Sequence, residues 1–368
     1  MKEFVGLRVA LVGPLPPPAG GMANQTHQLA ELLRGEGAYV DLVQTNAAYR
    51  PTWISQVPGL RAFFRLLPYL LNLWRAAGRN QLLHVMANSG WSWHLFAAPA
   101  IWIGFLKGKP VLVNYRGGEA GSFLERQSGV VRFSLRRASS LLVPSGFLEA
   151  IFAQHGFTST VLPNVVDLQR FYPTENSENP ATNELRLLVA RNLELLYDNA
   201  TAIRAFARIR EAYPNATLTV AGSGPEKGNL MLLAEQLGIG QAVRFTGRLD
   251  REAMANEYRL SAISINPSLA DNMPNSVLES LASGVPIVTT NVGGVPYLVK
   301  DGTTALFVPI NDDQAMAEAL LRLLKDVPLC KRLREEGLAE VRRYTWAKIG
   351  PQLAESYRLA LKSSPSKF

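Results

Sequence analysis

Short apolar runs alternate with longer amphipathic stretches along this chain of 368 residues, and the alternation stops once and then restarts. This pattern predicts βαβ units, in which each apolar run is a strand of a parallel sheet and each longer stretch is a helix. The strands expected in the first half are Arg8–Val12, Tyr39–Val43, Gln81–Met86, Pro110–Tyr115, Ser139–Val143 and Thr160–Leu162. Those expected in the second half are Leu185–Ala190, Thr217–Ala221, Val243–Thr246, Ala262–Ile265, Pro286–Thr290 and Leu306–Val308.

The chain is too long for one ordinary core, and its interruption places the boundary between two domains. A polar run rich in proline and asparagine lies at the interruption, so we predict a first domain over residues 1–170 and a linker over 171–183. A second domain follows over 184–346, and the segment 347–368 contributes a helix at about Ala347–Leu361 that packs back toward the first domain. The predicted fold class is α/β, with two Rossmann-like domains whose ligand sites lie at the carboxyl ends of the strands, in the cleft between the domains.

The helices between the strands are read from their apolar periodicity. They include Ala23–Leu33, Gly146–His155, Ala200–Glu211, Lys227–Leu237 and Asn275–Ser283. Ser145 precedes the second of these and is predicted to cap it.

Cysteine and histidine usage limits the chemistry of the chain. The single cysteine, Cys330, excludes an internal disulfide, and four scattered histidines form no zinc-binding cluster with it, which excludes the usual zinc sites. We expect no metal and no cofactor. His84 and His94 are predicted to be hydrogen-bonded core residues. The first residues do not form a signal peptide, and Leu82–Leu106 contains polar and turn-forming positions, so it is predicted to be a buried strand, loop and helix. A cytoplasmic protein is expected.

The net charge of +8 belongs entirely to residues 1–170, where 16 lysines and arginines outnumber 8 acidic residues. No acidic residue occurs between Asp41 and Glu119. Such asymmetry favours a polyanionic partner, and the chain lacks the signatures of nucleic-acid modules. An anionic membrane surface suits Leu60–Trp74, where leucine and aromatic side chains mix with arginines. The alternative is that this segment is a core-packed helix with arginines at its edge, which leaves localisation either cytoplasmic or peripheral on the inner face of the membrane.

Two loops carry residue types that suit a phosphate ligand. The first, Gly13-Pro-Leu-Pro-Pro-Pro-Ala-Gly20-Gly21-Met-Ala-Asn24, joins the first strand to a helix, and its paired glycines let the backbone approach a ligand. By itself it is also compatible with a plain connector. The second, Asn266 to Pro286, runs from a strand through Asp271 and Pro274 into a helix that holds Glu279. Asn275 or Ser276 is predicted to cap this helix, whose N-terminus suits a phosphate.

With these loops in place, the chain resembles the family-4 retaining glycosyltransferases, also called glycosyl transferases group 1, which have the GT-B architecture. The resemblance rests on an ordered set of segments. These are the Gly20-Gly21 loop, Val143-Pro-Ser-Gly-Phe147, Leu162-Pro-Asn-Val-Val-Asp167, Val220-Ala-Gly-Ser-Gly-Pro225, Arg244-Phe-Thr-Gly247, the acidic pair Asp271 and Glu279, and Asn291-Val-Gly-Gly-Val-Pro296.

The resemblance implies roles for particular residues. Asp271, Arg191 and Arg116 are the implied catalytic residues. Glu279 would bind the ribose hydroxyls, and Gly20 and Gly21 would lie against the diphosphate of the donor. The remaining implied donor-binding residues are Gly222, Arg248, Leu249, Asn272, Met273, Pro274, Asn275 and Ser276.

Three positions depart from the family pattern. Asp271 stands where glutamate is usual, and Leu196 and Tyr197 occupy the places of an expected lysine, a loss that Lys227 or Arg116 would have to offset. Arg116 itself stands where many members have histidine; it cannot act as a base but can bind a phosphate. Glu119 nearby either takes part in acid chemistry or is simply solvated.

The implied function is retaining, metal-independent transfer of a hexose from a nucleotide-sugar such as a UDP- or GDP-sugar. The expected acceptor is a sugar or a lipid-linked sugar in surface polysaccharide or glycolipid synthesis. Two rivals remain: a nucleotide-sugar epimerase, and a catalytically silent GT-B protein that binds a sugar nucleotide.

Overall fold

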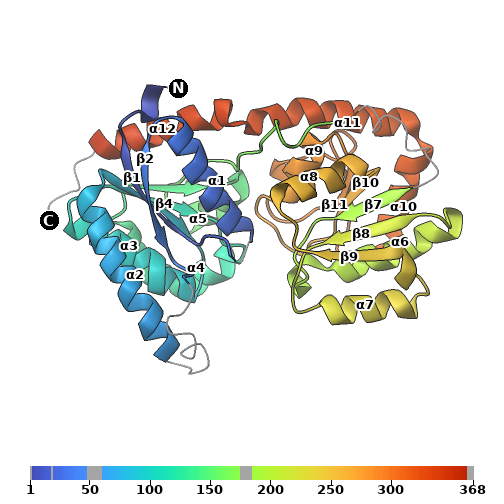
Figure 1. Ribbon diagram of the computed structural model, residues 1–368, viewed down its shortest axis with the longest axis horizontal. Helices are drawn as coiled ribbons and strands as arrows, with labels where there is room; N and C mark the ends of the chain where they lie inside the picture. The colour runs from blue at the N-terminus through green and yellow to red at the C-terminus, as the bar shows by residue number, and fades with distance from the viewer. Residues whose placement is uncertain (1, 18–19, 48–59, 175–184, 363–368) are drawn as a thin grey trace. The chain divides into compact units, whose positions relative to one another are not determined.

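The computed structural model describes residues 2–17, 20–47, 60–174 and 185–362. The chain forms two compact units. The first contains Met1–Asn164 together with Ala347–Phe368, and the second contains Val165–Trp346. Each unit is an α/β sandwich around one sheet of six parallel strands (Figure 1).

The sheet of the first unit has the order β2-β1-β3-β4-β5-β6. Its strands are β1 (Arg8–Gly13), β2 (Tyr39–Gln44), β3 (Leu82–Ala87), β4 (Val111–Tyr115), β5 (Ser140–Val143) and β6 (Thr160–Val161). The central strands are buried on both faces because helices cover both faces.

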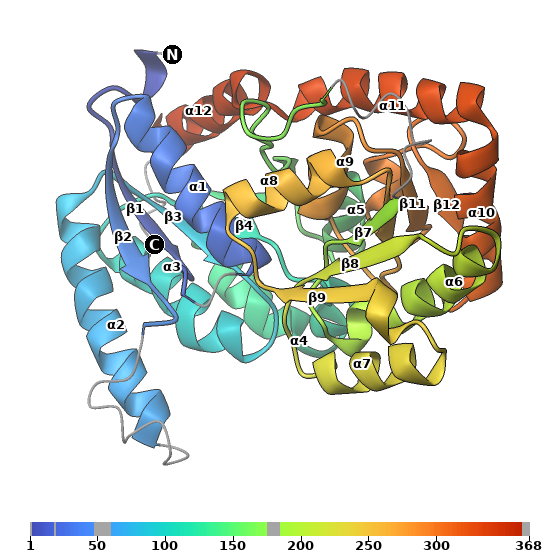
Figure 2. The same ribbon diagram turned by 45° about the vertical axis from the view of Figure 1, so that its right-hand side comes forward.

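The helices of the first unit divide between the two faces of its sheet. One layer consists of α2 (Leu60–Arg79), α3 (Ala98–Leu106), α4 (Ala120–Leu135) and α5 (Gly146–Gln154), which pack in that order. A π-helical turn, Trp93–Ala97, leads into α3. The other face holds α1 (Gly21–Gly35) and the last helix of the chain, α12 (Trp346–Lys362), as Figure 2 shows.

The second unit has the strand order β12-β11-β10-β7-β8-β9. Its strands are β7 (Arg186–Val189), β8 (Thr217–Ala221), β9 (Val243–Gly247), β10 (Ile263–Asn266), β11 (Ile287–Thr290) and β12 (Leu306–Val308). Two buried apolar clusters, one on each side of the sheet, form its core. They are covered by α6 (Asn199–Ala212), α7 (Lys227–Gln236) and α10 (Asp313–Lys325) on one face, and by α8 (Arg251–Leu260) and α9 (Asn275–Ala282) on the other. α11 (Val327–Val341) packs against α9 and α10.

All twelve strands expected from the sequence are present, and two parallel sheets confirm the predicted fold class. The strand, loop and helix predicted for residues 82–106 are also found. Ser145 occupies the predicted cap position before α5, but its hydroxyl is buried and makes no capping hydrogen bond, so that part of the prediction is wrong.

The boundary between the units differs from the predicted one at residue 170. The structure places it between Asn164 and Val165. The reason is packing: Phe171 is buried in the second unit, where its ring lies edge-on to Tyr258, with 5.9 Å between the ring centroids. The predicted linker, residues 171–183, mostly falls outside the described residues.

No helix in the described part of the chain combines the length and the apolar character that crossing a bilayer needs.

Candidate functional site

Arg191 and Asp271 follow two adjacent strands of the second sheet, β7 and β10, where the order of strand addition reverses. The chain builds β8 and β9 on one side of β7 and places β10, β11 and β12 on the other. Ligands of open parallel sheets bind at the carboxyl ends of the strands beside such a reversal. Arg191 comes just after β7, and Asp271 lies in the loop that leads from β10 to α9. Topology therefore brings the two predicted residues to the same edge of the sheet.

The Arg191 guanidinium is held on several sides. One terminal nitrogen forms an ion pair with Asp271, and the other donates to the Ser276 hydroxyl at 3.2 Å. The Tyr197 ring lies over the guanidinium, with 4.1 Å between Cζ and the ring centroid. The Arg191 and Asp271 side chains are only 10% and 13% exposed, so this positive charge is largely shielded from water. A shielded, fixed guanidinium interacts more strongly with a phosphate than one in bulk solvent.

Asp271 is tied to the protein at both of its carboxylate oxygens. One oxygen binds Arg191, and the other accepts the backbone N–H of Asn272 at 2.9 Å. Burial raises the pKa of Asp271, while Arg191 and the Asn272 N–H oppose that rise. The Asp271 carboxylate therefore orients Arg191, in addition to the catalytic role that the family resemblance implies for it.

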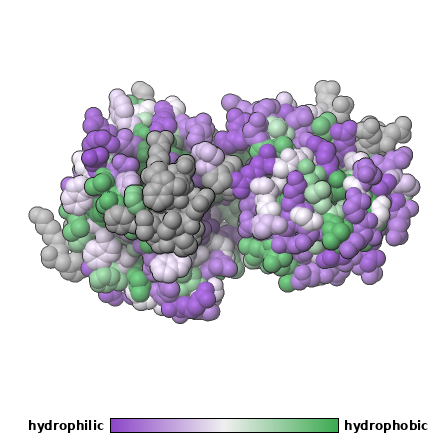
Figure 3. Space-filling model, turned by 60° about the horizontal axis from the view of Figure 1, so that its bottom comes forward, coloured by the Kyte–Doolittle hydropathy of each residue, from purple (hydrophilic) through white to green (hydrophobic). Residues whose placement is uncertain are grey.

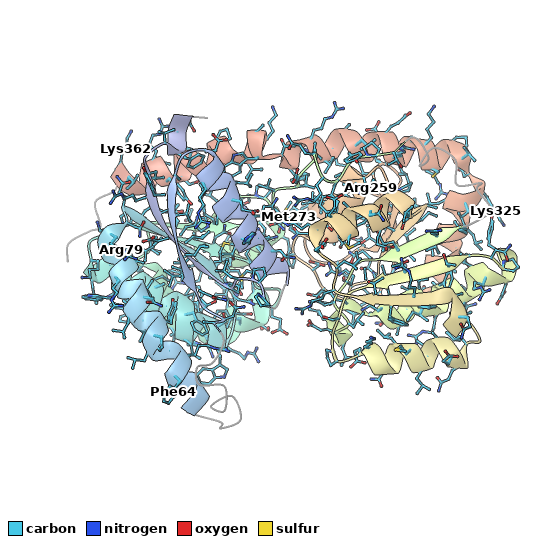
Figure 4. All side chains as sticks on the ribbon, viewed as in Figure 1. Phe64, Arg79, Arg259, Met273, Lys325 and Lys362 are labelled. Atoms are coloured by element: carbon cyan, nitrogen blue, oxygen red, sulfur yellow. The ribbon has the colours of Figure 1, made fainter. Side chains whose placement is uncertain are left out.

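The start of α9 departs from the predicted capping. Pro274 occupies the cap position with an extended backbone, and neither Asn275 nor Ser276 caps the helix through its side chain. The Ser276 hydroxyl instead accepts from Arg191. Among the implied donor-binding residues, Pro274 has no backbone N–H to donate, and the backbone N–H of Asn272 bonds to Asp271. Met273 and Pro274 are buried at the end of the loop, and Figure 4 labels the position of Met273.

Buried hydrogen bonds fix the loop between β10 and α9. Ser268 donates to Asn266 at 2.9 Å, and the Thr290 hydroxyl donates to the Ser268 carbonyl at 2.6 Å. The Gly294 N–H donates to the Asp271 carbonyl at 2.8 Å, which ties the loop after β11 to the same place. The site residues therefore sit on a rigid support rather than on a loose loop.

Glu279 lies a little over one turn into α9, where Tyr258 from α8 contacts it. The Tyr258 hydroxyl donates to the Ser276 carbonyl at 3.0 Å and also interacts with the Glu279 carboxyl. Burial raises the pKa of Glu279 to about 7, and Tyr258, Arg251 and Arg191 oppose the rise. This carboxyl group therefore changes its charge close to neutral pH.

Gly222 has a structural reason to be glycine. A Cβ atom there would lie 2.0 Å from the Arg191 carbonyl oxygen, so only glycine allows the chain after β8 to approach the chain after β7. Gly222 also pairs with Gly247, next to Arg248 and Leu249. The Arg248 side chain is exposed and Leu249 is half-buried. Their role in lining a nucleotide pocket stays a prediction.

Tyr197 is a residue that the sequence reasoning missed. It was noted only as a replacement for an expected lysine, yet its ring covers one face of Arg191. Lys227, suggested as a substitute cation, lies exposed at the first residue of α7. The signal that could have found Tyr197 is its position shortly after Arg191 in the sequence, within reach of a guanidinium–aromatic contact.

The other predicted residues belong to the first unit. Gly20 caps α1 with an extended backbone, and among the described residues a Cβ atom on Gly20 or Gly21 would meet nothing within 4 Å. Their contact with a donor diphosphate stays a prediction. Glu119 is exposed at the start of α4 and makes no capping bond. Its two alternatives, acid chemistry or simple solvation, stay open.

Arg116 follows β4 and is anchored through its side chain. Its Nε–H donates to Asn114 at 2.8 Å, and Nη1 donates to the Asn164 side chain. Burial lowers the pKa of Arg116 to about 10, which leaves it charged near neutral pH. Among the residues that the structure describes, no group of three or more histidine, cysteine and acidic side chains is arranged to hold a metal ion.

Comparison with known proteins adds to this geometry. Residues 19–170 match the family model described as Glycosyltransferase Family 4, and residues 173–339 match the model described as Glycosyl transferases group 1. The D-inositol 3-phosphate glycosyltransferase of Corynebacterium urealyticum is 31% identical over 57% of this chain and 53% of its own length. The chain thus aligns with about half of that relative. Glycogen synthase of Mycobacterium tuberculosis is 25% identical over 96% of this chain and 95% of its own length.

Solved structures agree on the fold. Sucrose-phosphate synthase from Thermosynechococcus elongatus superposes with a TM-score of 0.78 over 97% of this chain and all of its own, at 21% identity. Anabaena HepE, solved in complex with UDP and glucose, gives a TM-score of 0.74 over 95% of this chain and 99% of its own, at 16% identity. With both halves matched by glycosyltransferase family models and both sheets of the expected kind, the chain resembles the family-4, group 1 type of glycosyltransferases and has the GT-B fold.

Proposed function

We propose that this chain transfers a sugar from a nucleotide-sugar donor to an acceptor hydroxyl, with retention of configuration and without a metal. The observation that carries the proposal is the Arg191 guanidinium, which is fixed beside the first turn of α9 by Asp271, Ser276 and Tyr197. Related structures solved with UDP and UDP-glucose support a nucleotide-sugar as the donor.

The chemistry follows from where charge develops. When the bond between the sugar and the donor diphosphate breaks, negative charge builds up on the leaving phosphate. A fixed guanidinium and a helix N-terminus stabilise that charge, and neither has to reorganise as it forms. In this proposal Arg191 and α9 supply the field that a metal ion supplies in other transferases. The acceptor oxygen then attacks from the face that the diphosphate leaves, and a phosphate oxygen accepts the acceptor proton.

The proposed acceptor is a sugar or lipid-linked sugar in surface polysaccharide or glycolipid synthesis, reached at the inner face of the membrane. The support is the exposed side of α2, which carries Leu67, Leu71 and Trp74 with exposed fractions of 46%, 51% and 47%. Lys107 Nζ lies over the Trp74 ring at 3.8 Å from its centroid, which places a cation among these apolar groups. Aromatic and basic side chains combined in this way suit an anionic lipid surface.

The sequence left two interpretations of Leu60–Trp74, a membrane-binding surface and a core-packed helix, and α2 has both an exposed side and a buried side. Tyr69 and Leu73 are buried, so one side of α2 is a core-packed face, while the opposite side is exposed. Figure 4 labels Phe64 in the first half of α2 and Arg79 at its last residue. Hydrophobic and hydrophilic side chains also intermix on the surface drawn in Figure 3.

The test incubates the protein with UDP-, GDP- and ADP-glucose, with and without EDTA, and follows release of the nucleoside diphosphate. Wild-type protein should release it from one donor in the presence of EDTA. Arg191→Ala and Asp271→Ala should lose about 10²- to 10³-fold of that rate, the size expected for removing a charge-stabilising group. Arg208→Ala is the matched control, because Arg208 is a half-exposed arginine of the same unit paired with Asp313.

The same assay separates the rivals. An epimerase would change the donor sugar without releasing the diphosphate, and a silent binder would bind a nucleotide without turnover. Release that is unaffected by Arg191→Ala would contradict the proposal. The anomeric configuration of the product, measured by NMR, tests retention.

A further inference from the structure

A chain of hydrogen bonds crosses the buried side of the first sheet and ends at Arg116. The Arg116 Nε–H donates to Asn114 Oδ1 at 2.8 Å, and Asn114 Nδ2 lies 3.0 Å from His84 Nε2. His84 Nδ1 lies 2.9 Å from the Tyr357 hydroxyl of α12. Asn114 and His84 are completely buried, and Tyr357 is 2% exposed. These hydrogen bonds thus link β4, β3 and the C-terminal helix through buried side chains.

The donor and the acceptor of each hydrogen bond in this series follow from the chemistry of the arginine. A guanidinium can only donate, so the atom of Asn114 that faces Arg116 has to be the oxygen. The amide nitrogen of Asn114 then faces His84 and donates to its Nε2 lone pair. His84 must consequently carry its proton on Nδ1, from which it donates to the Tyr357 hydroxyl.

The charge of His84 agrees with this arrangement. A protonated imidazole has no lone pair to accept from Asn114. Burial and the nearby Arg116 charge lower the pKa of His84 to about 3, so the ring stays neutral near physiological pH. The direction of the chain is therefore stable across the pH range in which a transferase works.

The far end of Arg116 is also held. Its Nη1 donates to Asn164, which is 4% exposed and is the last residue of the first unit before the chain enters the second. The backbone N–H of Arg116 donates to the Ala87 carbonyl at the end of β3 at 2.9 Å. With its Nε edge and one terminal nitrogen fixed, the guanidinium has little rotational freedom.

We propose that Tyr357, His84 and Asn114 are positioning residues that set the orientation of the Arg116 guanidinium from the C-terminal helix. The proposal rests on the proposed function and on the implied catalytic role of Arg116, which can bind a phosphate of the donor or the acceptor. Fixing such a group matters because a displacement of about 1 Å can lower a rate by roughly 10²-fold. It also gives α12, the last helix of the chain, a part in the site of the first unit.

The first experiment measures the hydrogen bonds directly and does not require enzymatic activity. Long-range proton–nitrogen NMR spectra of the ¹⁵N-histidine-labelled protein should show His84 protonated on Nδ1, the form less common in free histidine. The Arg116 Nε–H should exchange slowly with solvent, and faster in Tyr357→Phe, which keeps the ring and removes only the hydroxyl acceptor. An Nε2–H tautomer for His84, or an exchange rate that Tyr357→Phe leaves unchanged, would overturn the proposal.

The second experiment measures sugar transfer. His84→Leu removes the acceptor of the Asn114 amide, so kcat should fall roughly ten- to hundredfold. His84→Gln, whose side-chain oxygen can accept in place of Nε2, should recover most of the loss. Nucleoside diphosphate binding, read as a thermal shift, should be weakened no more by His84→Leu than by Arg116→Ala, because His84 acts on the site only through Arg116.

A double-mutant cycle distinguishes positioning from general damage to the fold. In an Arg116→Ala background, His84→Leu should cost nothing further, because the group to be positioned is gone. An equal loss in that background would show a purely structural role. If wild-type protein transfers no sugar at all, the proposed function fails, whereas the tautomer and exchange measurements still decide whether the chain orients Arg116.

Discussion

The Tyr197 ring covers one face of the Arg191 guanidinium, with 4.1 Å between Cζ and the ring centroid. Tyr197 belongs to a short 3₁₀ turn, Leu195–Tyr197, whose Leu196 carbonyl accepts the Leu269 N–H at 2.9 Å. The turn is thereby fastened to the loop that carries Asp271. An aromatic face thus occupies the place where the family pattern would put a second cation, and it shields the guanidinium from water on that side.

Replacing the Tyr197 ring should leave the Arg191 guanidinium less firmly fixed in its position. Tyr197→Leu removes the cation–π contact, which is worth about 0.5 to 2 kcal/mol, so the transfer rate should fall roughly 2- to 30-fold. Tyr197→Phe keeps the aromatic face and should stay close to wild type. Steady-state kinetics of the two variants check this, and an equal loss in both would mean that the hydroxyl rather than the ring matters.

Donor binding should depend on pH through Glu279. Its raised pKa of about 7 means that the carboxyl is largely protonated at pH 6 and ionised at pH 8. Ribose hydroxyls donate more strongly to the ionised form, so kcat/KM for the donor should rise with pH, with its midpoint at about 7, and level off above about pH 8. The profile of wild type is compared with that of Glu279→Gln, which should lose the step near pH 7. A step that persists in the variant would assign the titration to another group.

A methyl group at Gly222 should destabilise the second unit. Its Cβ would lie 2.0 Å from the Arg191 carbonyl oxygen, and the backbone would have to move, at a cost of about 1–3 kcal/mol in the free energy of unfolding. Gly228→Ala is the control, because Gly228 lies exposed in α7 and a Cβ there meets nothing within 4 Å. Thermal unfolding should show a lower Tm for Gly222→Ala and an equal or higher Tm for Gly228→Ala.

The exposed side of α2 should bind anionic lipid. Co-sedimentation at low salt is expected with vesicles that contain phosphatidylglycerol and not with phosphatidylcholine alone. Replacing Leu71 and Trp74 together by alanine should weaken binding roughly tenfold or more, since the apolar contact is lost. Leu359→Ala is the control, an exposed leucine of α12. Absence of binding by the wild-type protein at low salt would contradict the proposal that α2 contacts an anionic membrane.

The strands could be predicted because buried parallel strands are nearly continuous apolar runs, and Leu306–Val308 was placed without error. Arg191 and Asp271, whose roles the resemblance implies, lie together because both follow adjacent strands at the carboxyl end of the sheet, and their roles stay predictions. The hydrogen bond between His84 and Tyr357 could not be predicted, because it joins residues 273 positions apart through tertiary packing alone. The cap at α9 was predicted wrongly because Ser276 has a stronger partner in Arg191, which local sequence patterns do not reveal.

Binding of a nucleoside diphosphate to the Arg191 site tests the central claim most directly. The measurement is the Tm of wild type and of Arg191→Ala with increasing UDP, GDP or ADP. The account predicts that one of the three raises the wild-type Tm in proportion to the logarithm of its concentration, and that Arg191→Ala loses most of this rise. A wild-type Tm that none of the nucleotides changes, or a rise that Arg191→Ala fully retains, would contradict it.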